Sequence, residues 1–367
     1  MNALRARASG LLPFLLCLFL ASPGETQNAP PGMARHVVIV TLDGLRWQEF
    51  FTGADRDYFT RDANGSGGEA ERRFWREAPG ERRAALMPFL WNTLAVQGQI
   101  LGDPAAGSTA RLTNGLWFSY PGYSEMLAGV ADPRVNSNDK VPNPNVTVLE
   151  WLNRRPGFEG KVAAFGSWDV LPSILAADRS GLVVGSGYAL LSSPSTERER
   201  AVNDLVADLP RYWDYGPFDA PVLYAALEHL RTTQPRVLYV LLGETDEWAH
   251  AGRYDLYLDA AFRADRFIER LWTTVQGMPE YAGRTALLVT TDHGRGATTT
   301  DWTDHGTKVP AAERTWMALM GPGVPALGLR RNVTVTTSQV AATIAALLGE
   351  DFRQGVPAAA PPIDVGR

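Results

Sequence analysis

Three of the five histidines in this chain lie close to an aspartate in the sequence. Asp246 and His250 are four residues apart, so on a helix both side chains would lie on one face and could hold one ion. Asp292 and His293 are adjacent, and His305 follows twelve residues later. Imidazole and carboxylate ligands without a thiolate suit zinc or another first-row divalent ion. These five residues therefore predict a metal site.

A second candidate for chemistry is Ser119. Pro121 and Gly122 follow it and would turn the chain into a helix, which places Ser119 near the helix N-terminus. Backbone amides at such a position favour an incoming phosphate, and a metal ion could hold the serine as an alkoxide. On this segment alone, an ordinary N-cap serine is the simpler interpretation.

The elements that must position these residues begin with three apolar runs rich in β-branched residues. They predict strands buried on both faces at 37–42, 236–242 and 285–291. In open parallel sheets, ligands bind beyond the carboxyl ends of the strands. Acidic residues follow all three runs, and in chain order they are Asp43, Glu244, Asp246 and Asp292. A site made by the three histidines alone is the alternative, but it would leave these aspartates without a role.

Helical periodicity predicts four longer helices around these strands. Shorter strands are predicted at 161–165 and 182–184. Because strands alternate with helices, we expect an α/β fold with a mostly parallel central sheet and helices on both faces. The predicted helices cover residues 87–96, 219–232, 254–275 and 337–348.

The N-terminal residues predict an exported protein. Arg5 and Arg7 precede an apolar run at 11–21, and small and polar residues follow, which is the order of a secretory signal peptide over 1–27. The run is about half the ~20 residues that span a bilayer, so we expect no stable membrane insertion after cleavage; an uncleaved anchor is the alternative. The mature protein would be periplasmic or extracellular. Cys17, the only cysteine, lies in this run, so the mature chain would have no disulfide.

We expect residues 28–367 to form a single domain. Residues 53–85 are charged and lack a sustained periodicity, so we predict that they form a surface insertion. A formal net charge of −5 and a pI near 5.6 argue against binding to a nucleic-acid duplex, which requires a clustered basic face. The sequence implies no protein partner.

Taken together and in chain order, the candidate residues resemble those of the alkaline phosphatase superfamily. They are most similar to its type I phosphodiesterase/nucleotide pyrophosphatase branch, and the resemblance covers nearly the whole mature chain. It implies an alkaline phosphatase-like fold, two divalent metal ions, most consistent with Zn²⁺, and a nucleophilic serine between them. One zinc would be held by Asp246, His250 and His305, the other by Asp43, Asp292 and His293, and the nucleophile would be Ser119.

Two departures from the family pattern bear on the subfamily. The family's diesterases usually carry Thr-x-Pro-Asn where this chain has Ser119-Tyr120-Pro121-Gly122. The family also uses an asparagine downstream of the nucleophile to bind a phosphoryl oxygen. Asn136 and Asn138 are both candidates, and either could instead be a turn residue. We prefer Asn138.

The resemblance implies a two-step displacement through a phosphoryl-enzyme on Ser119. Monoesterases of the superfamily add cations, sometimes a Lys-x-Arg pair, but the corresponding stretch 164–170 contains none. Several aromatic residues lie near the proposed site in sequence and suit a base or aryl group beside a singly charged diester, although they could also be core residues. They are Trp117, Phe118, Tyr120, Tyr123 and Trp168. We therefore predict a phosphodiesterase acting on a nucleotide or another small-molecule phosphate diester.

Other functions are possible alternatives. A phosphomonoesterase of the alkaline phosphatase type is the first of these. A phosphomutase or a non-catalytic metal-binding relative is less favoured, because an exported sugar-phosphate isomerase has little substrate and no ligand is missing. A sulfatase is disfavoured, because its signature requires arginine where Tyr123 stands.

Overall fold

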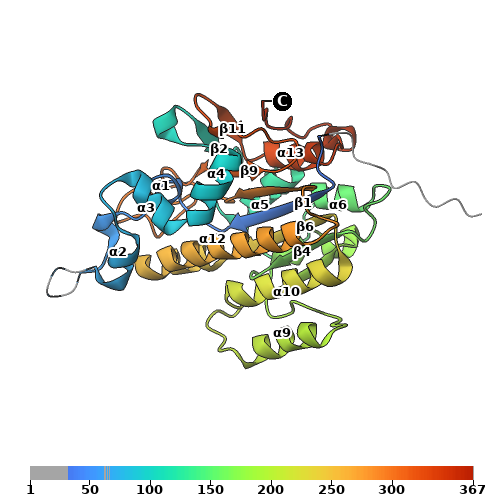
Figure 1. The fold of residues 1–367 in the computed structure, drawn as a ribbon, viewed down its shortest axis with the longest axis horizontal. Helices are drawn as coiled ribbons and strands as arrows, with labels where there is room; N and C mark the ends of the chain where they lie inside the picture. Colours follow the sequence, from blue (N-terminus) through green and yellow to red (C-terminus); the bar gives the residue numbers. More distant parts are fainter. Residues whose placement is uncertain (1–31, 62, 64, 66, 367) are drawn as a thin grey trace, which may run out of the picture.

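The computed structural model describes residues 32–61, 63, 65 and 67–366. The predicted signal peptide and Cys17 lie outside the described residues. The chain forms an α/β fold around one eight-stranded sheet (Figure 1). Five consecutive strands, including one at the edge of the sheet, are parallel to one another, and β9 runs antiparallel to both of its neighbours. In spatial order the strands are β10 (Gly328–Leu329), β2 (Gly98–Leu101), β9 (Met317–Met320), β7 (Thr285–Thr290), β1 (His36–Leu42), β6 (Val237–Leu242), β4 (Val162–Gly166) and β5 (Val183–Ser186).

Helices cover both faces of this sheet, as the sequence predicted (Figure 1). The alternation of side chains along β1 shows how the two layers form. Val38 and Val40 pack into one hydrophobic core with α10 and α12, whereas Val37 and Ile39 pack into the other with α5 and α13. The helices on the first face are α9 (Glu197–Asp208), α10 (Asp219–Thr233) and α12 (Tyr254–Gly277), and those on the second include α5 (Ser119–Ala128), α6 (Val148–Asn153) and α13 (Gln339–Leu347).

The remaining elements are short. A second, three-stranded sheet has the order β11-β3-β8. Antiparallel β2 and β9 and this small sheet were not predicted, because runs of two to four residues carry too little periodicity. Their bounds are β3 (Thr109–Arg111), β8 (Arg314–Thr315), β11 (Thr334–Thr336), α1 (Trp47–Thr52), α4 (Ala95–Gln97), α7 (Leu171–Ile174), α8 (Ala177–Ser180), α11 (Glu244–His250) and the 3-10 turns Arg56–Tyr58, Pro104–Ala106 and Phe352–Gln354.

Two predicted segments differ in detail from the sequence expectation. The helix predicted at 87–96 is a π-helical turn, Leu90–Leu94, that continues into α4. The predicted surface insertion at 53–85 contains α2 (Gly68–Phe74) and α3 (Pro79–Leu86) at one end of the molecule (Figure 1). Phe59 and Phe74 are buried in the core, so this segment also contributes to packing. Within the described part of the chain, no helix combines the length and apolar composition needed to cross a membrane.

A buried carboxyl group holds the π-helical turn against α12. The Asp265 side chain accepts hydrogen bonds from the backbone N–H groups of Phe89 and Leu90, at 2.8 and 2.9 Å. Burial raises the pKa of Asp265 from its ordinary value of 3.8 to about 7. The folded protein therefore binds the Asp265 proton more tightly than the unfolded chain does.

We predict that Asp265→Asn flattens the pH dependence of stability. The stabilisation from Asp265 is fully present below about pH 4 and is lost as the pH rises through about 7. The free energy of unfolding of the wild type should therefore fall by up to roughly 4 kcal/mol more than that of the variant across this window. Urea unfolding at a series of pH values measures both, with the exposed Asp204→Asn as control. Parallel profiles for wild type and D265N would contradict the assignment.

Candidate active site and metal centre

The central strands deliver acidic residues to one edge of the sheet, as their order in the sequence predicted. β1 lies between β6 and β7, with Leu42 opposite Leu242 and Thr41 opposite Thr290. The three strands thus end side by side. Asp43 follows β1 directly, and its backbone N–H donates to Leu242 O at 2.9 Å.

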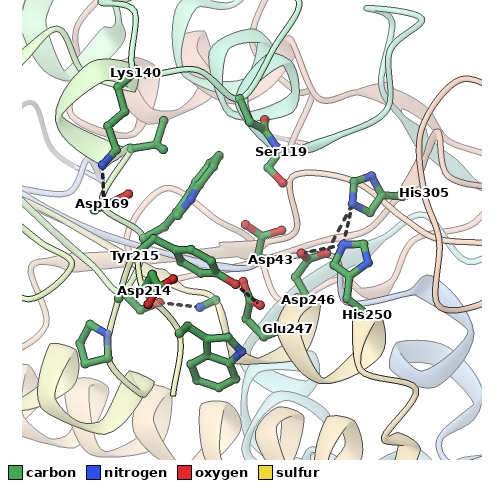
Figure 2. Close-up of a pocket in the computed structure, with 18 residues that line it drawn as sticks. Asp43, Ser119, Lys140, Asp169, Asp214, Tyr215, Asp246, Glu247, His250 and His305 are labelled. Carbon is green, nitrogen blue, oxygen red and sulfur yellow. Dashed lines mark hydrogen bonds and ion pairs between the residues drawn. The ribbon is translucent and has the colours of Figure 1, made fainter. Parts of the chain in front are cut away.

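The first cluster of possible metal ligands consists of Asp246, His250 and His305. Each offers one ligand atom, and these atoms lie within 4.8 Å of one another. Asp246 and His250 share one face of α11, with Asp246 Oδ2 3.2 Å from His250 Nε2. His305 comes from the loop after β7, and its Nε2 lies 3.0 Å from His250 Nε2 (Figure 2). The cluster opens to solvent, because the His250 side chain is exposed.

The second cluster consists of Asp43, Asp292 and His293, all of them buried. His293 Nε2 lies 3.3 Å from Asp43 Oδ1 and 3.4 Å from Asp292 Oδ2. His293 Nδ1 lies 2.8 Å from Gly294 O. Donation from Nδ1 to this carbonyl leaves the Nε2 lone pair directed into the cluster, which is the arrangement of a metal-ligating histidine.

Both clusters fit divalent cations. Asp43 Oδ1 and Asp292 Oδ2 are buried, and no hydrogen-bond donor among the described residues satisfies them. Burial, and then repulsion from neighbouring carboxylates, raises the pKa of both groups well above the ordinary range. A cation would remove this conflict, and neutral imidazole with carboxylate is a donor set that zinc accepts.

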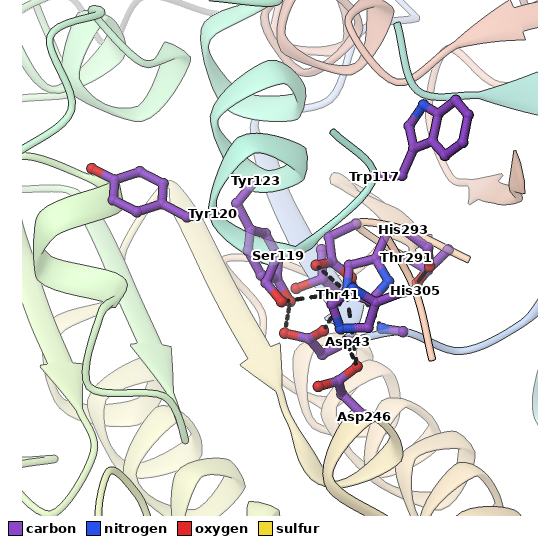
Figure 3. A network of polar contacts seen from close by, with 12 residues as sticks. Thr41, Asp43, Trp117, Ser119, Tyr120, Tyr123, Asp246, Thr291, His293 and His305 are labelled. Atoms are coloured by element: carbon purple, nitrogen blue, oxygen red, sulfur yellow. Dashed lines mark hydrogen bonds and ion pairs between the residues drawn. The ribbon is translucent and has the colours of Figure 1, made fainter. Parts of the chain in front are cut away.

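Ser119 belongs to α5, which packs on the face of the sheet opposite to α10 and α12, and its side chain reaches the second cluster. It is the first residue of α5, it is 5% exposed, and its Oγ lies 3.3 Å from His293 Nε2 (Figure 3). Close approach between α5 and the end of β7 depends on Gly122. A Cβ at this position would lie 2.6 Å from Asp292 O. Glycine at position 122 is therefore a steric requirement of this chain.

Neighbouring groups orient the ligands of the second cluster. The Tyr123 hydroxyl donates to Asp43 Oδ2 at 3.0 Å, and the Gly44 backbone N–H donates to Asp292 Oδ1 at 3.0 Å. Gly44 has a φ of +58°, and a Cβ there would lie 2.5 Å from Asp246 Oδ1. This position therefore requires glycine for both conformation and space.

Arg295 is a charged residue of the site that the sequence analysis missed. Its guanidinium is fully buried and donates to Asp246 Oδ1, to Asp246 O and to Thr303 O. Burial alone would raise the pKa of Asp246, but Arg295 and His250 hold it well below its usual range. The position two residues after His293 was visible in the sequence, but its inward direction was not.

A cavity of about 560 Å³ opens beside Ser119 and the first cluster (Figure 2). Asn138 lines it, and its Oδ1 accepts the Tyr120 backbone N–H at 3.0 Å. Asn136 does not line it and donates instead to Pro133 O at the surface. Of the two asparagines, the structure brings only Asn138 to the cavity.

The aromatic residues expected near the site divide into two groups. Tyr120 and Tyr123 are buried in the hydrophobic core, whereas Trp168 lines the cavity. Trp117 and Phe118 are half-buried and belong to neither group, because they do not line the cavity. Two further aromatic residues of the lining were missed, Trp213 and Tyr215, and the Tyr215 hydroxyl donates to Glu247. They come from the excursion after β5, which the sequence does not connect with the site.

No protein-family model and no curated protein sequence matches this chain. Solved structures do. The alkaline phosphatase PafA superposes with a TM-score of 0.61 at 13% identity, covering 92% of this chain and 100% of PafA. This chain has the alkaline phosphatase superfamily fold. Two other structures with this fold are the phosphonate monoester hydrolase of Agrobacterium radiobacter (TM-score 0.53, 12% identity, 90% and 78% covered) and the lipoteichoic acid synthase LtaP from Listeria monocytogenes (0.53, 11%, 88% and 74%).

The fold resemblance expected from the sequence is thus confirmed. At these identities the likeness concerns the fold, and the nucleotide pyrophosphatase/phosphodiesterase branch stays a prediction. The activity of this alkaline phosphatase-like chain depends on the residues of its own site.

We predict that Tyr123→Phe weakens metal binding at the second cluster. The variant loses the hydrogen bond that orients Asp43, and removal of such a partner typically lowers metal affinity about 10- to 100-fold. Competition with a chromogenic chelator measures the affinity without any enzyme assay. Tyr281→Phe is the matched control, because this buried hydroxyl donates to Pro235 O away from the site. Equal zinc affinities for Y123F and Y281F would contradict the prediction.

Proposed function

We propose that this protein is an exported, metal-dependent hydrolase of phosphate esters that prefers diesters and acts through Ser119. The observation that carries the proposal is the position of Ser119 at the N-terminus of α5, beside two separate Asp/His clusters. Export rests on the sequence of residues 1–27. The boundaries of a single domain over 28–367 belong to the same proposal.

We assign one divalent ion, most consistent with Zn²⁺, to each of the two clusters. When bound, such ions supply positive charge that activates an oxygen nucleophile and stabilises a leaving oxygen. The chain's contribution is a fixed set of ligands. Tyr123, Gly44 and the Gly294 carbonyl hold the second cluster, and Arg295 holds the first.

In the first chemical step, Ser119 Oγ forms a bond to phosphorus while the bond from phosphorus to the ester oxygen breaks. With a diester, the result is a serine phosphodiester that keeps the second ester group, and the proton lost from Ser119 Oγ balances the one that the leaving alcohol takes up. In the second step, a water oxygen replaces Ser119 Oγ on phosphorus and the serine is regenerated. The N-terminus of α5 favours the negative charge that the phosphoryl group brings.

Asn138 would bind a phosphoryl oxygen during both steps. Its Oδ1 already accepts the Tyr120 backbone N–H, which fixes the amide orientation. The Nδ2 donors therefore remain for a ligand in the cavity. Donors fixed in advance of the reaction stabilise charge that develops in the transition state.

Two features of the cavity support a diester as substrate. Of the described residues that line it, Lys140 alone is a lysine or arginine, and Asp169 neutralises it at 2.5 Å. The aromatic side chains of Trp168, Trp213 and Tyr215 offer apolar contact area for an alcohol group of the substrate. A phosphomonoesterase is the second candidate, and the presence of Lys140 in the cavity favours it.

We predict that Ser119→Ala lowers kcat at least ~10³-fold, because nucleophilic displacement is lost while metal binding remains. The wild type and the variant are assayed with a nitrophenyl phosphate diester, a monoester and a sulfate ester, and their zinc content is measured. Ser124→Ala is the matched control: this buried serine lies on the same helix and accepts from Asn143. Full activity of metal-loaded S119A would overturn the proposed role, and a preference for the monoester would move the function to phosphatase.

We predict that Asn138→Ala lowers kcat/KM for the preferred ester about 10²-fold, through loss of a donor to the phosphoryl oxygen. Asn136→Ala, at the exposed turn two residues earlier, is the matched control and should retain kcat/KM within about twofold. Similar values for the two variants would show that the asparagine has no role in the reaction.

A further inference from the structure

The ion pair between Lys140 and Asp169 stands at the mouth of the proposed active site. Lys140 Nζ lies 2.5 Å from Asp169 Oδ2, and both residues line the same cavity as Ser119 (Figure 2). The Lys140 side chain is 59% exposed and that of Asp169 is 28% exposed. The two side chains come from segments 29 residues apart in sequence. Residues 164–170 contain no lysine or arginine. The cation in the cavity is instead Lys140, which belongs to the loop between α5 and α6.

The loop that carries Lys140 is fixed to the first turn of the Ser119 helix. Tyr120 contacts this loop on both sides of Lys140. The Tyr120 backbone N–H donates to Asn138 Oδ1, and the Tyr120 hydroxyl donates to Val141 O at 2.6 Å. The backbone on both sides of Lys140 is therefore tied to the Ser119 helix whether or not the ion pair forms. A lysine stem is long and flexible, so the ammonium group can reorient without any change in the backbone.

Asp169 is also held independently of Lys140. Its backbone N–H donates to Tyr215 O at 3.1 Å, and a Cβ on the neighbouring Gly187 would lie 2.7 Å from Asp169 Cβ. Its second oxygen, Oδ1, is buried and has no hydrogen-bond donor among the described residues. Lys140 is thus the partner that offsets the charge of this carboxylate, which ties the ammonium group to the wall of the cavity.

We propose that Asp169 is a specificity-determining residue, which restrains Lys140 so that the site favours singly charged phosphate diesters over doubly charged monoesters. The inference rests on the proposed function. A monoester carries close to two negative charges above about pH 7, because its second pKa is ~6, whereas a diester carries one. A free ammonium group near the phosphoryl site would therefore favour the monoester, and pairing with Asp169 removes that advantage.

The test compares wild type with Asp169→Asn, Lys140→Met and the double variant D169N/K140M. Each is assayed with a nitrophenyl phosphate monoester and a bis-nitrophenyl diester, and the ratio of the two kcat/KM values is recorded. We expect D169N to raise the monoester-to-diester ratio about tenfold, the size of one modest charge interaction. The double variant should return to the wild-type ratio, because the effect operates through Lys140.

Asp214→Asn is the matched control. Asp214 is an exposed carboxylate that lines the same cavity without contacting Lys140, so this variant removes a negative charge but frees no cation. Its ratio should change less than about twofold. An unchanged ratio in D169N, or equal ratios in D169N and the double variant, would overturn the inference.

Binding of inorganic phosphate to the metal-loaded protein, measured by calorimetry, separates this inference from the proposed function. If the wild type hydrolyses neither phosphate ester, the proposed function fails, but tighter phosphate binding by D169N than by both the wild type and D169N/K140M would still show that Asp169 restrains Lys140. If the esters are hydrolysed and phosphate binds equally to both variants, the proposed function stands and the inference fails.

Discussion

Burial of three aspartates at one edge of a parallel sheet is the constraint around which this structure is organised. Asp43, Asp246 and Asp292 are each less than 9% exposed. Carboxylates removed from water in this way repel one another and require positive charge nearby. Arg295 offsets Asp246, but the oxygens left without donors on Asp43 and Asp292 show that the described side chains do not complete the balance. This imbalance supports the proposal that the Asp/His clusters bind cations.

The loop after β7 brings the last ligand, His305, to this edge and must be held in place. Arg295 donates to Thr303 O, two residues before the histidine. From the other side, buried Arg46 donates to Gly296 O. Trp302 packs edge-on against Tyr58 and Tyr254, so an aromatic layer fixes the middle of the loop. Rigid support of this kind is what a metal ligand on a loop requires.

The electrostatics of the cavity differ from those of the metal clusters. The clusters bring negative charge together and call for cations, whereas the mouth of the cavity carries Lys140 already paired with Asp169. In the specificity that we propose, the preference for one substrate charge depends on how tightly this pair is held. The acidic clusters and the Lys140–Asp169 ion pair can share one cavity. The ion pair is partly exposed, so solvent screens its interaction with the clusters.

The sequence by itself predicted the strands that build the sheet and the residues at their ends. β1, β6 and β7 were recognisable because strands buried on both faces are continuously apolar. Asp43 follows β1 directly, and Asp292 lies two residues after the end of β7. Helix α12 was recognisable from its amphipathic period. The short strands β2, β9 and β10 were not, since pairing with distant strands, and not local pattern, creates them.

Only the tertiary structure decided which side chains meet at this edge. It distinguished Asn138 from Asn136 in the same loop. The Tyr120 backbone N–H donates to Asn138, whereas Asn136 donates to Pro133 O. It also brought in Arg295 and Lys140, whose carboxylate partners lie 49 and 29 residues away in the sequence. Residues that follow a strand are placed by the sheet and can be predicted from the sequence. Residues on loops are placed by contacts with distant segments, which the linear order of the chain does not contain.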